Sequence, residues 1–149
     1  MRILIALLTA FAFILPAAAA EKFDDPVKLV EHIYAHYSDG TIEQLEENAY
    51  WSPRLAELIA TDEARGELSS LTFDPFINSQ EDFLSDLQIN LAAANDKKAL
   101  VAVGFDNGGG YQQSMFTLVP GPDGWKIDEI EGVTPGREWT LSDVLAQPL

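Results

Sequence analysis

The first third of the chain carries apolar residues at the spacing of an amphipathic helix. Two acids and a proline at residues 24–26 favour a helix start. The apolar positions that follow recur at i, i+3, i+4 and i+7, which places them on one face: Val30, Ile33, Tyr34 and Tyr37. A second helix is predicted from Thr41 to about Tyr50, and a third from Ser52 to about Arg65, where its apolar face ends.

After Leu71 the apolar period changes from that of a helix to the alternation of a strand. Four alternating segments are separated by turn signals rich in Gly, Asn, Asp and Pro. They cover residues 87–93, 101–105, 111–119 and 125–130. Short turns between consecutive strands predict an antiparallel meander, and a brief helix from about residue 140 closes the chain. Helices followed by a meander predict an α+β domain with the helices packed on one face of the sheet.

Residues 1–20 have the pattern of a secretory signal peptide. Arg2 gives a positive start, residues 3–15 form an apolar run, and the alanines at 17–20 suit signal peptidase. We expect cleavage after Ala20 and a periplasmic or secreted protein. The run is shorter than the about 20 residues of a membrane-spanning helix, so we expect no membrane insertion after cleavage and one domain over residues 21–149.

The chain is acidic and lacks cysteine. Its 24 Asp and Glu against 9 Lys and Arg give a formal net charge of −15, or −16 once Arg2 has left with the leader. Nucleic acid and anionic lipid need Lys and Arg to neutralise phosphate, so we expect neither as a partner. Acidic clusters at residues 43–47 and 128–131 could instead face a basic protein, although a solvated surface is their more common role.

His32 and His36 are the one metal-ligand pattern, since imidazoles at i and i+4 meet on one face of a helix. The helical period places His32 nearly opposite the apolar stripe and His36 not far from it. No third ligand is identifiable. We therefore expect both histidines on or near the solvent face, no metal site and no cofactor.

The segment from Thr72 to Phe83 is the most distinctive in the chain. Asp74 precedes a proline, so its backbone is extended and its carboxylate can accept the amide hydrogens of Phe76 or Ile77. A structural turn is the favoured interpretation of the motif residues Asp74, Pro75, Phe76, Gln80 and Asp82. Asp74 is also a candidate catalytic base.

On the predicted sheet, Glu129 is the one acid that shares the inward parity of Trp125 and Ile127, and apolar Ile130 beside it indicates that the register slips there. It is the second candidate base. Several aromatic residues could line a ligand cleft, although packing in the core is their more common role. The candidates are Tyr34, Tyr37, Trp51 and Trp125.

The order of elements is similar to the cone-shaped, cystatin-like fold of the nuclear transport factor 2-like superfamily, and within it the chain resembles a family of small exported bacterial proteins of unknown function. The resemblance spans about residues 22–147 and rests on three segments: Pro53–Ile59, Phe73–Phe76 with Gln80 and Asp82, and Gly124–Ile130. It implies N-terminal helices filling the concave side of a strongly curved antiparallel sheet, with frequent dimerisation through the outer face. It implies no catalytic residues, because the superfamily includes isomerases, dehydratases and non-catalytic scaffolds.

Three functions stay open on the sequence alone. The first is a non-enzymatic binding or interaction module for an unknown small molecule. The second is an enzyme with an aromatic-lined pocket, in which Asp74 or Glu129 is the base and a nearby tyrosine the hydrogen-bond donor. The third is an acidic inhibitor or immunity protein that binds a basic hydrolase.

Overall fold

A computed structural model of the chain describes residues 21–38, 47–80, 83–108 and 110–148. The elements follow in the order α1 (Pro26–Ser38), the 3₁₀ helix η1 (Glu47–Ala49), α2 (Pro53–Glu63), η2 (Gly66–Leu68), β1 (Leu84–Ala94), β2 (Ala99–Asn107), β3 (Tyr111–Gly121), β4 (Gly124–Gly132), β5 (Trp139–Thr140) and α3 (Leu141–Leu145). None of the described helices has the length and apolar character that crossing a membrane requires.

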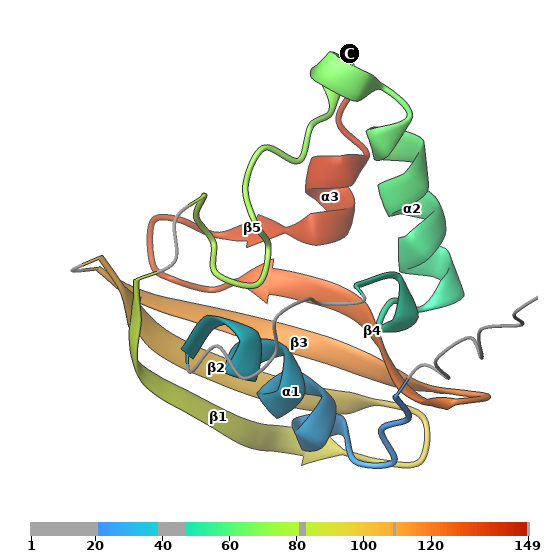
Figure 1. Ribbon diagram of the computed structural model, residues 1–149, viewed down its shortest axis with the longest axis vertical. Helices are drawn as coiled ribbons and strands as arrows, with labels where there is room; N and C mark the ends of the chain where they lie inside the picture. The colour runs from blue at the N-terminus through green and yellow to red at the C-terminus, as the bar shows by residue number, and fades with distance from the viewer. Residues whose placement is uncertain (1–20, 39–46, 81–82, 109, 149) are drawn as a thin grey trace, which may run out of the picture.

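The five strands form one antiparallel sheet in the order β1-β2-β3-β4-β5, and the sheet is curved (Figure 1). Helix α1 lies across the concave face and contacts β1, β2 and β4, whereas α2 and α3 pack on each other and on β4. This arrangement confirms the predicted α+β class and the meander of four long strands. The short strand β5 was not predicted, because two residues are too few to show a period.

Capping side chains start the two longer helices where the sequence predicts. The carboxylate of Asp25 accepts the amide hydrogen of Val27 (2.8 Å) at the start of α1. At the start of α2, the hydroxyl oxygen of Ser52 accepts the amide hydrogen of Leu55 (3.2 Å), and Pro53 occupies the first turn.

The helix predicted from Thr41 to Tyr50 falls mostly on residues 39–46, which lie outside the described residues. Its described end is the short helix η1, after which the chain runs beside β4. The amide of Ser52 donates to the carbonyl of Ile127 (2.8 Å), and the amide of Ile127 donates to that of Tyr50 (2.8 Å). A very short stretch of extended chain at Trp51 and Ser52 therefore borders β4. Ser52 precedes a proline, which disfavours the helical conformation at that residue.

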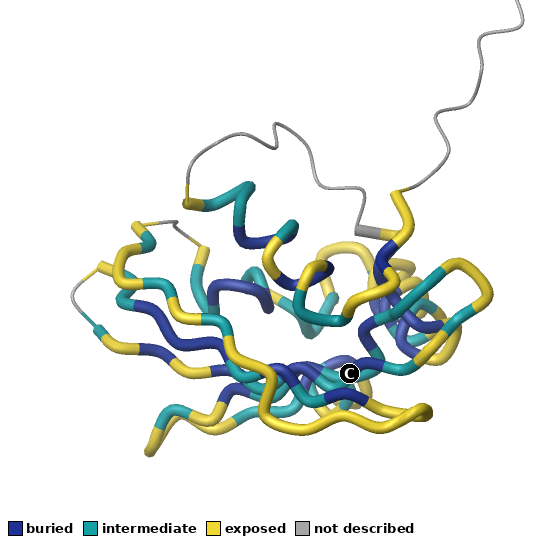
Figure 2. Tube along the Cα trace, turned by 90° about the horizontal axis from the view of Figure 1, so that it is seen from below, coloured by how far each residue is buried: buried dark blue, intermediate teal, exposed yellow. Residues whose placement is uncertain are grey.

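The core lies between α1 and the middle strands and is rich in aromatic side chains. Fully buried residues of the helix, the loop and the strands meet there: Tyr34, Phe76, Phe105 and Phe116. Figure 2 shows the buried residues on the sheet-facing side of α1 and along the central strands, and exposed residues along β1 and the turn after it. Aromatic packing thus fills much of the space between α1 and the sheet.

Strand β4 contains the register slip that the sequence indicates. Thr117 pairs with Glu129 and Leu118 with Ile127, so Asp128 is an extra residue, a β-bulge. As a result Ile127 and Ile130 both enter the core, each fully buried. The bulge also turns Asp128 toward the start of α2, where its carboxylate accepts the hydroxyl hydrogen of Ser52 (2.6 Å).

Candidate functional site

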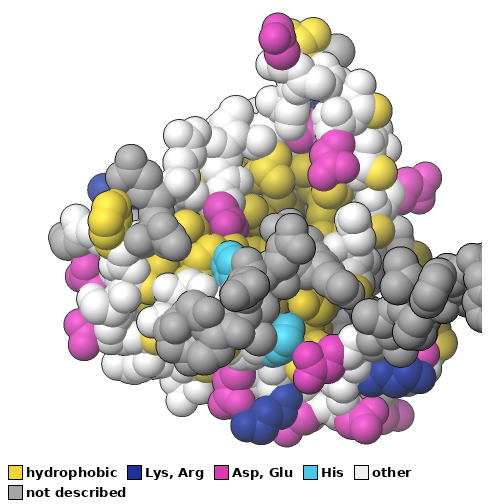
Figure 3. Space-filling view, in the orientation of Figure 1, with side chains coloured by type: hydrophobic (Ala, Val, Ile, Leu, Met, Phe, Trp, Pro, Cys, Tyr) yellow, Lys and Arg dark blue, Asp and Glu magenta, His cyan; other side chains and the backbone are white. Residues whose placement is uncertain are grey.

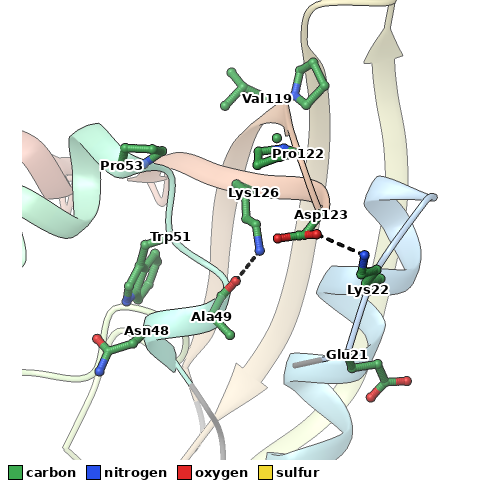
Figure 4. Close-up of a pocket in the computed structure, with 12 residues that line it drawn as sticks. Glu21, Lys22, Asn48, Ala49, Trp51, Pro53, Val119, Pro122, Asp123 and Lys126 are labelled. Carbon is green, nitrogen blue, oxygen red and sulfur yellow. Dashed lines mark hydrogen bonds and ion pairs between the residues drawn. The ribbon is translucent and has the colours of Figure 1, made fainter. Parts of the chain in front are cut away.

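A pocket of about 540 Å³ opens where three segments far apart in the sequence come together. They are the N-terminal residues Glu21 and Lys22, residues 48–53, and the β3–β4 hairpin from Val119 to Lys126 (Figure 4). We name this cavity the hairpin pocket. Its volume lies within the about 300–1,000 Å³ typical of small-molecule sites.

The first wall of the hairpin pocket is the β3–β4 hairpin with the N-terminal segment bound to it. Gly121 pairs with Gly124, which leaves Pro122 and Asp123 as the turn residues. The amide of Trp125 donates to the carbonyl of Phe23 (2.8 Å), and its indole Nε1 donates to the carbonyl of Asp24 (3.1 Å). One backbone and one side-chain hydrogen bond from Trp125 therefore hold residues 23–24 beside the hairpin.

The second wall is the segment that carries Trp51. This side chain is 5% exposed and stacks on Phe76 with their ring centroids 5.2 Å apart. Because Tyr50 and Ser52 on either side are hydrogen-bonded to Ile127, the indole is fixed between the core and the pocket. The pocket is consequently formed by backbone pairing before any ligand arrives.

Charged groups gather at one end of the hairpin pocket. The Nζ of Lys22 lies 3.0 Å from the Oδ1 of Asp123, and the Nζ of Lys126 donates to the carbonyl of Ala49 (2.5 Å). Figure 4 shows the Asp123 carboxylate between the two lysines. The pKa of Asp123 is lowered by the hydrogen bond and the charge of Lys22, with a smaller contribution from the charge of Lys126.

The remaining lining is largely apolar. Its apolar side chains are one indole, three prolines and two aliphatic residues: Trp51, Pro53, Pro120, Pro122, Val119 and Ala49. Asn48 and Gly121 complete it. The described lining residues include no histidine, serine, threonine or tyrosine. Such a set supplies apolar contact and a few charged groups.

Of the four aromatic residues predicted to line a pocket, only Trp51 lines the hairpin pocket. Tyr34 is fully buried and its hydroxyl donates to the carbonyl of Phe76; burial, and then the charge of Asp74, raises its pKa well above the ordinary value. Tyr37 is half-buried over the loop of Asp74. Trp125 holds the N-terminal segment, as described above.

The Asp74 motif forms the predicted turn. One carboxylate oxygen of Asp74 accepts the amide hydrogen of Phe76 (2.9 Å), and the other accepts the hydroxyl hydrogen of Tyr37 (2.6 Å). Pro75 and Phe76 are buried, and the side-chain amide of Gln80 donates to the carbonyl of Thr72 (2.7 Å). Asp82 lies outside the described residues. The motif therefore attaches the loop before β1 to α1.

Glu129 and the neighbouring acid also have partners within the fold. An Oε1 of Glu129 accepts the amide hydrogen of Ser142 (3.0 Å) at the start of α3, and Arg54 lies between Glu129 and Asp128. Burial opposes ionisation of Asp128, but hydrogen bonds from Ser52 and Arg54 outweigh it and its pKa is lowered. Two of the three acids of the 128–131 cluster, Asp128 and Glu129, thus bind the helices of their own chain.

The expected position of His32 is wrong. Its side chain is only 16% exposed, because the N-terminal segment folds back over that face of α1. Its Nε2 lies 3.1 Å from the hydroxyl of Tyr50, its Nδ1 lies 3.5 Å from a carboxylate oxygen of Glu21, and its ring packs on Phe23. The helical period alone could not show that residues 21–25 cover this face.

His36 packs on the ring of Tyr37. The described residues contain no group of three metal-ligating side chains.

A second apolar region lies on the face shown in Figure 3. Hydrophobic side chains gather in the middle of this face, between α1 and α2, and the acidic side chains lie mostly at its edges. In the buried core, Tyr34 packs on Phe105 and Phe116.

Lys126 and the prolines of the hairpin pocket were not singled out from the sequence. The sequence pattern indicates only a turn at residues 120–124 and an outward-facing strand position at Lys126. The available signal was a lysine beside a proline-rich turn in a chain with few basic residues. This lysine and turn indicate a pocket only when the segment 48–53 is known to lie opposite the turn.

Comparison with known protein families, with curated proteins and with solved structures finds no match to this chain.

Proposed function

We propose that this chain is an exported binding protein, and that the hairpin pocket holds a small ligand with an apolar body. The observation that carries the proposal is the pocket itself, about 540 Å³ in volume with walls of Trp51, proline and valine. A concave, mostly apolar cavity with a few polar groups is the usual form of a small-molecule site.

Preorganisation supports binding at this pocket. Both walls are held by hydrogen bonds between backbone groups, at Phe23 with Trp125 and at Tyr50 and Ser52 with Ile127. A wall that is already ordered loses little conformational entropy when a ligand binds. The ligand would meet a formed site.

Export and the cone fold are part of this proposal. Glu21, the first residue after the expected cleavage site, already lies beside His32, and Lys22 binds Asp123. Removal of residues 1–20 would therefore leave a chain whose first residues belong to the fold. The curved sheet with α1 on its concave face supports the expected membership of the nuclear transport factor 2-like superfamily.

The two other functions have less support among the described residues. An enzyme based on Asp74 would have the predicted tyrosine, Tyr37, at 2.6 Å, yet both oxygens of Asp74 already accept hydrogen bonds that hold its own loop. An inhibitor that uses the acids at 128–131 would have to release Asp128 and Glu129 from Arg54. We therefore favour binding without catalysis.

Binding of a neutral apolar probe tests the proposal. We expect N-phenylnaphthylamine to bind the wild-type protein saturably, with a rise in its fluorescence as it leaves water. Val119→Glu places a carboxylate in the apolar wall, directly across the hairpin from Lys126. It should weaken this binding by about tenfold or more, because the apolar body of the probe would have to cover charged groups.

Val133→Glu is the matched control, since Val133 is 41% exposed and does not line the hairpin pocket. It should leave the affinity unchanged. Absence of saturable binding to the wild type, or equal effects of the two substitutions, would contradict the proposal.

A further inference from the structure

We infer that the hairpin pocket selects small organic acids, and that the ammonium of Lys126 receives their anionic group. The inference rests on the proposed binding function and specifies the ligand class. It follows from the hydrogen bonding of Lys126, from the distribution of charge around it and from the walls that it faces.

The ammonium of Lys126 has donors to spare. It carries three N–H groups, and the carbonyl of Ala49 accepts the one hydrogen bond that it makes to a described residue. The side chain is only half exposed, and its methylene stem lies against Gly121. The stem is thus packed while the charged end faces the pocket, where a ligand can accept the remaining hydrogens.

Among the described residues, no carboxylate lies within ion-pair distance of the Lys126 ammonium. Asp123 is the nearest acid of the lining, and it is bound to Lys22 at 3.0 Å. Two lysines accompany one aspartate at this end of the pocket, and the other acid of the lining, Glu21, lies 3.5 Å from the Nδ1 of His32. In a chain with a formal net charge of −15, an end of a pocket at which lysines outnumber aspartate is unusual, and it favours the binding of an anion.

The walls limit the kind of anion. Proline, valine and indole surfaces lower the local polarity, which strengthens a charge contact made against them and disfavours ligands covered with hydroxyl groups. One spare ammonium matches one carboxylate or sulfonate better than a multiply charged phosphate, which usually needs several basic or backbone donors. The fitting ligand is a monoanion with an apolar or aromatic body.

A pair of fluorescent probes that differ by one sulfonate tests this inference. Anilinonaphthalenesulfonate is the anionic counterpart of N-phenylnaphthylamine. Both are titrated against protein purified from cells that express the full-length chain. We expect the wild type to bind the anion about tenfold more tightly than the neutral probe, the size of one partly exposed charge contact.

Substitutions at Lys126 separate its charge from its hydrogen bond. Lys126→Gln is neutral but can still donate to Ala49, and we expect it to remove the preference for the anion while changing the affinity for the neutral probe less than twofold. Lys126→Arg keeps the charge and should keep the preference. Lys97→Gln, at an exposed lysine in the β1–β2 turn outside the pocket, should change nothing.

The outcomes distinguish the two proposals. Equal binding of both probes by the wild type, or an unchanged preference in Lys126→Gln, would overturn the inference and leave the binding function standing. Failure of both probes to bind would overturn both. Circular dichroism reports whether Lys126→Gln folds; if it does not, the preference of the wild type between the two probes decides by itself.

Discussion

Among single residues, Asp62 shows most clearly how one side chain can organise a loop. It is 1% exposed at the end of α2 and accepts hydrogen bonds from the hydroxyl of Ser69 (2.6 Å) and from the amides of Ser70 (2.9 Å) and Leu71 (3.1 Å). Arg65 lies 3.3 Å from it. Burial alone would raise the pKa of Asp62, but these hydrogen bonds and the charge of Arg65 outweigh burial and lower it.

The lowered pKa of Asp62 predicts a pH-dependent contribution to stability. Because the folded pKa is below the unfolded value of about 3.9, this contribution is fully present above about pH 4 and is lost as the pH falls through the folded pKa. Asp62→Asn should lower the free energy of unfolding by about 2 kcal/mol at neutral pH, since buried donors lose a charged acceptor. Urea denaturation at about pH 7 and about pH 2.5 measures the difference, which should be smaller at the lower pH.

Asp96→Asn serves as the control for this prediction. Asp96 is an exposed residue of the β1–β2 turn, and its substitution should cost little at either pH. If Asp62→Asn lowered the free energy of unfolding equally at both pH values, the charge of the Asp62 carboxylate would not contribute to stability.

At the scale of elements, the N-terminal segment and the β3–β4 hairpin depend on Gly124. Its φ of +98° favours glycine, and Phe23 forms a parallel bridge with it. A Cβ at this position would overlap the backbone of Phe23. The same residue therefore closes the turn and lets the N-terminal segment approach.

Gly124→Ala should displace residues 21–25 from the hairpin. We expect a loss of about 2–3 kcal/mol in the free energy of unfolding, from strain at positive φ together with lost backbone hydrogen bonds. Hydrogen exchange at the amide of Trp125, which donates to Phe23, should become faster.

Gly136→Ala isolates the strain from the contact. Gly136 also has a positive φ, +78°, but a Cβ there would meet nothing within 4 Å. It should cost about 1 kcal/mol and leave exchange at Trp125 unchanged. If both alanine variants behaved alike, backbone strain alone would account for the loss at Gly124.

For the whole molecule, the central expectation is that the working protein begins at Glu21. Expression of the full-length chain in a bacterium should give a periplasmic product whose intact mass corresponds to residues 21–149, since signal peptidase requires small residues before the cut. Ala20→Arg should prevent cleavage at this bond. A purified wild-type product that keeps residues 1–20 would contradict the expectation.

Much of the fold was predictable because local patterns carry it. The apolar stripe of α1, the serine and proline that start α2, and the glycine-rich turns between strands each act over a few residues. The sequence also indicates the bulge in β4, since Ile127 and Ile130 are both apolar but lie three positions apart, which the two-residue alternation of a regular strand does not allow on one face. The Asp74 turn was predictable for the same reason: its hydrogen bond to Phe76 spans two residues.

The candidate site was far less predictable, because its parts are distant in the chain. Trp51 was recognised as an aromatic candidate, but nothing near it in sequence indicates that Pro122 and Lys126 lie across a pocket from it. Asp62 was missed altogether, since a charged residue on a helix gives no sign that the following loop will cover it. His32 was misplaced for the same reason.

The sequence by itself determined the helices α1 and α2, the four long strands, their order and the antiparallel meander, because helical and strand periods and turn residues act between close neighbours. Only the tertiary structure decided which polar groups are satisfied within the fold and which face a cavity. Asp74, Asp128 and Glu129 look like candidate chemistry in the sequence, yet each is bound by its own chain. Lys126 has no distinguishing feature in the sequence, yet in the structure it faces a pocket. The pocket exists because packing brings together residues 21–22, 48–53 and 119–126, which are far apart in the sequence.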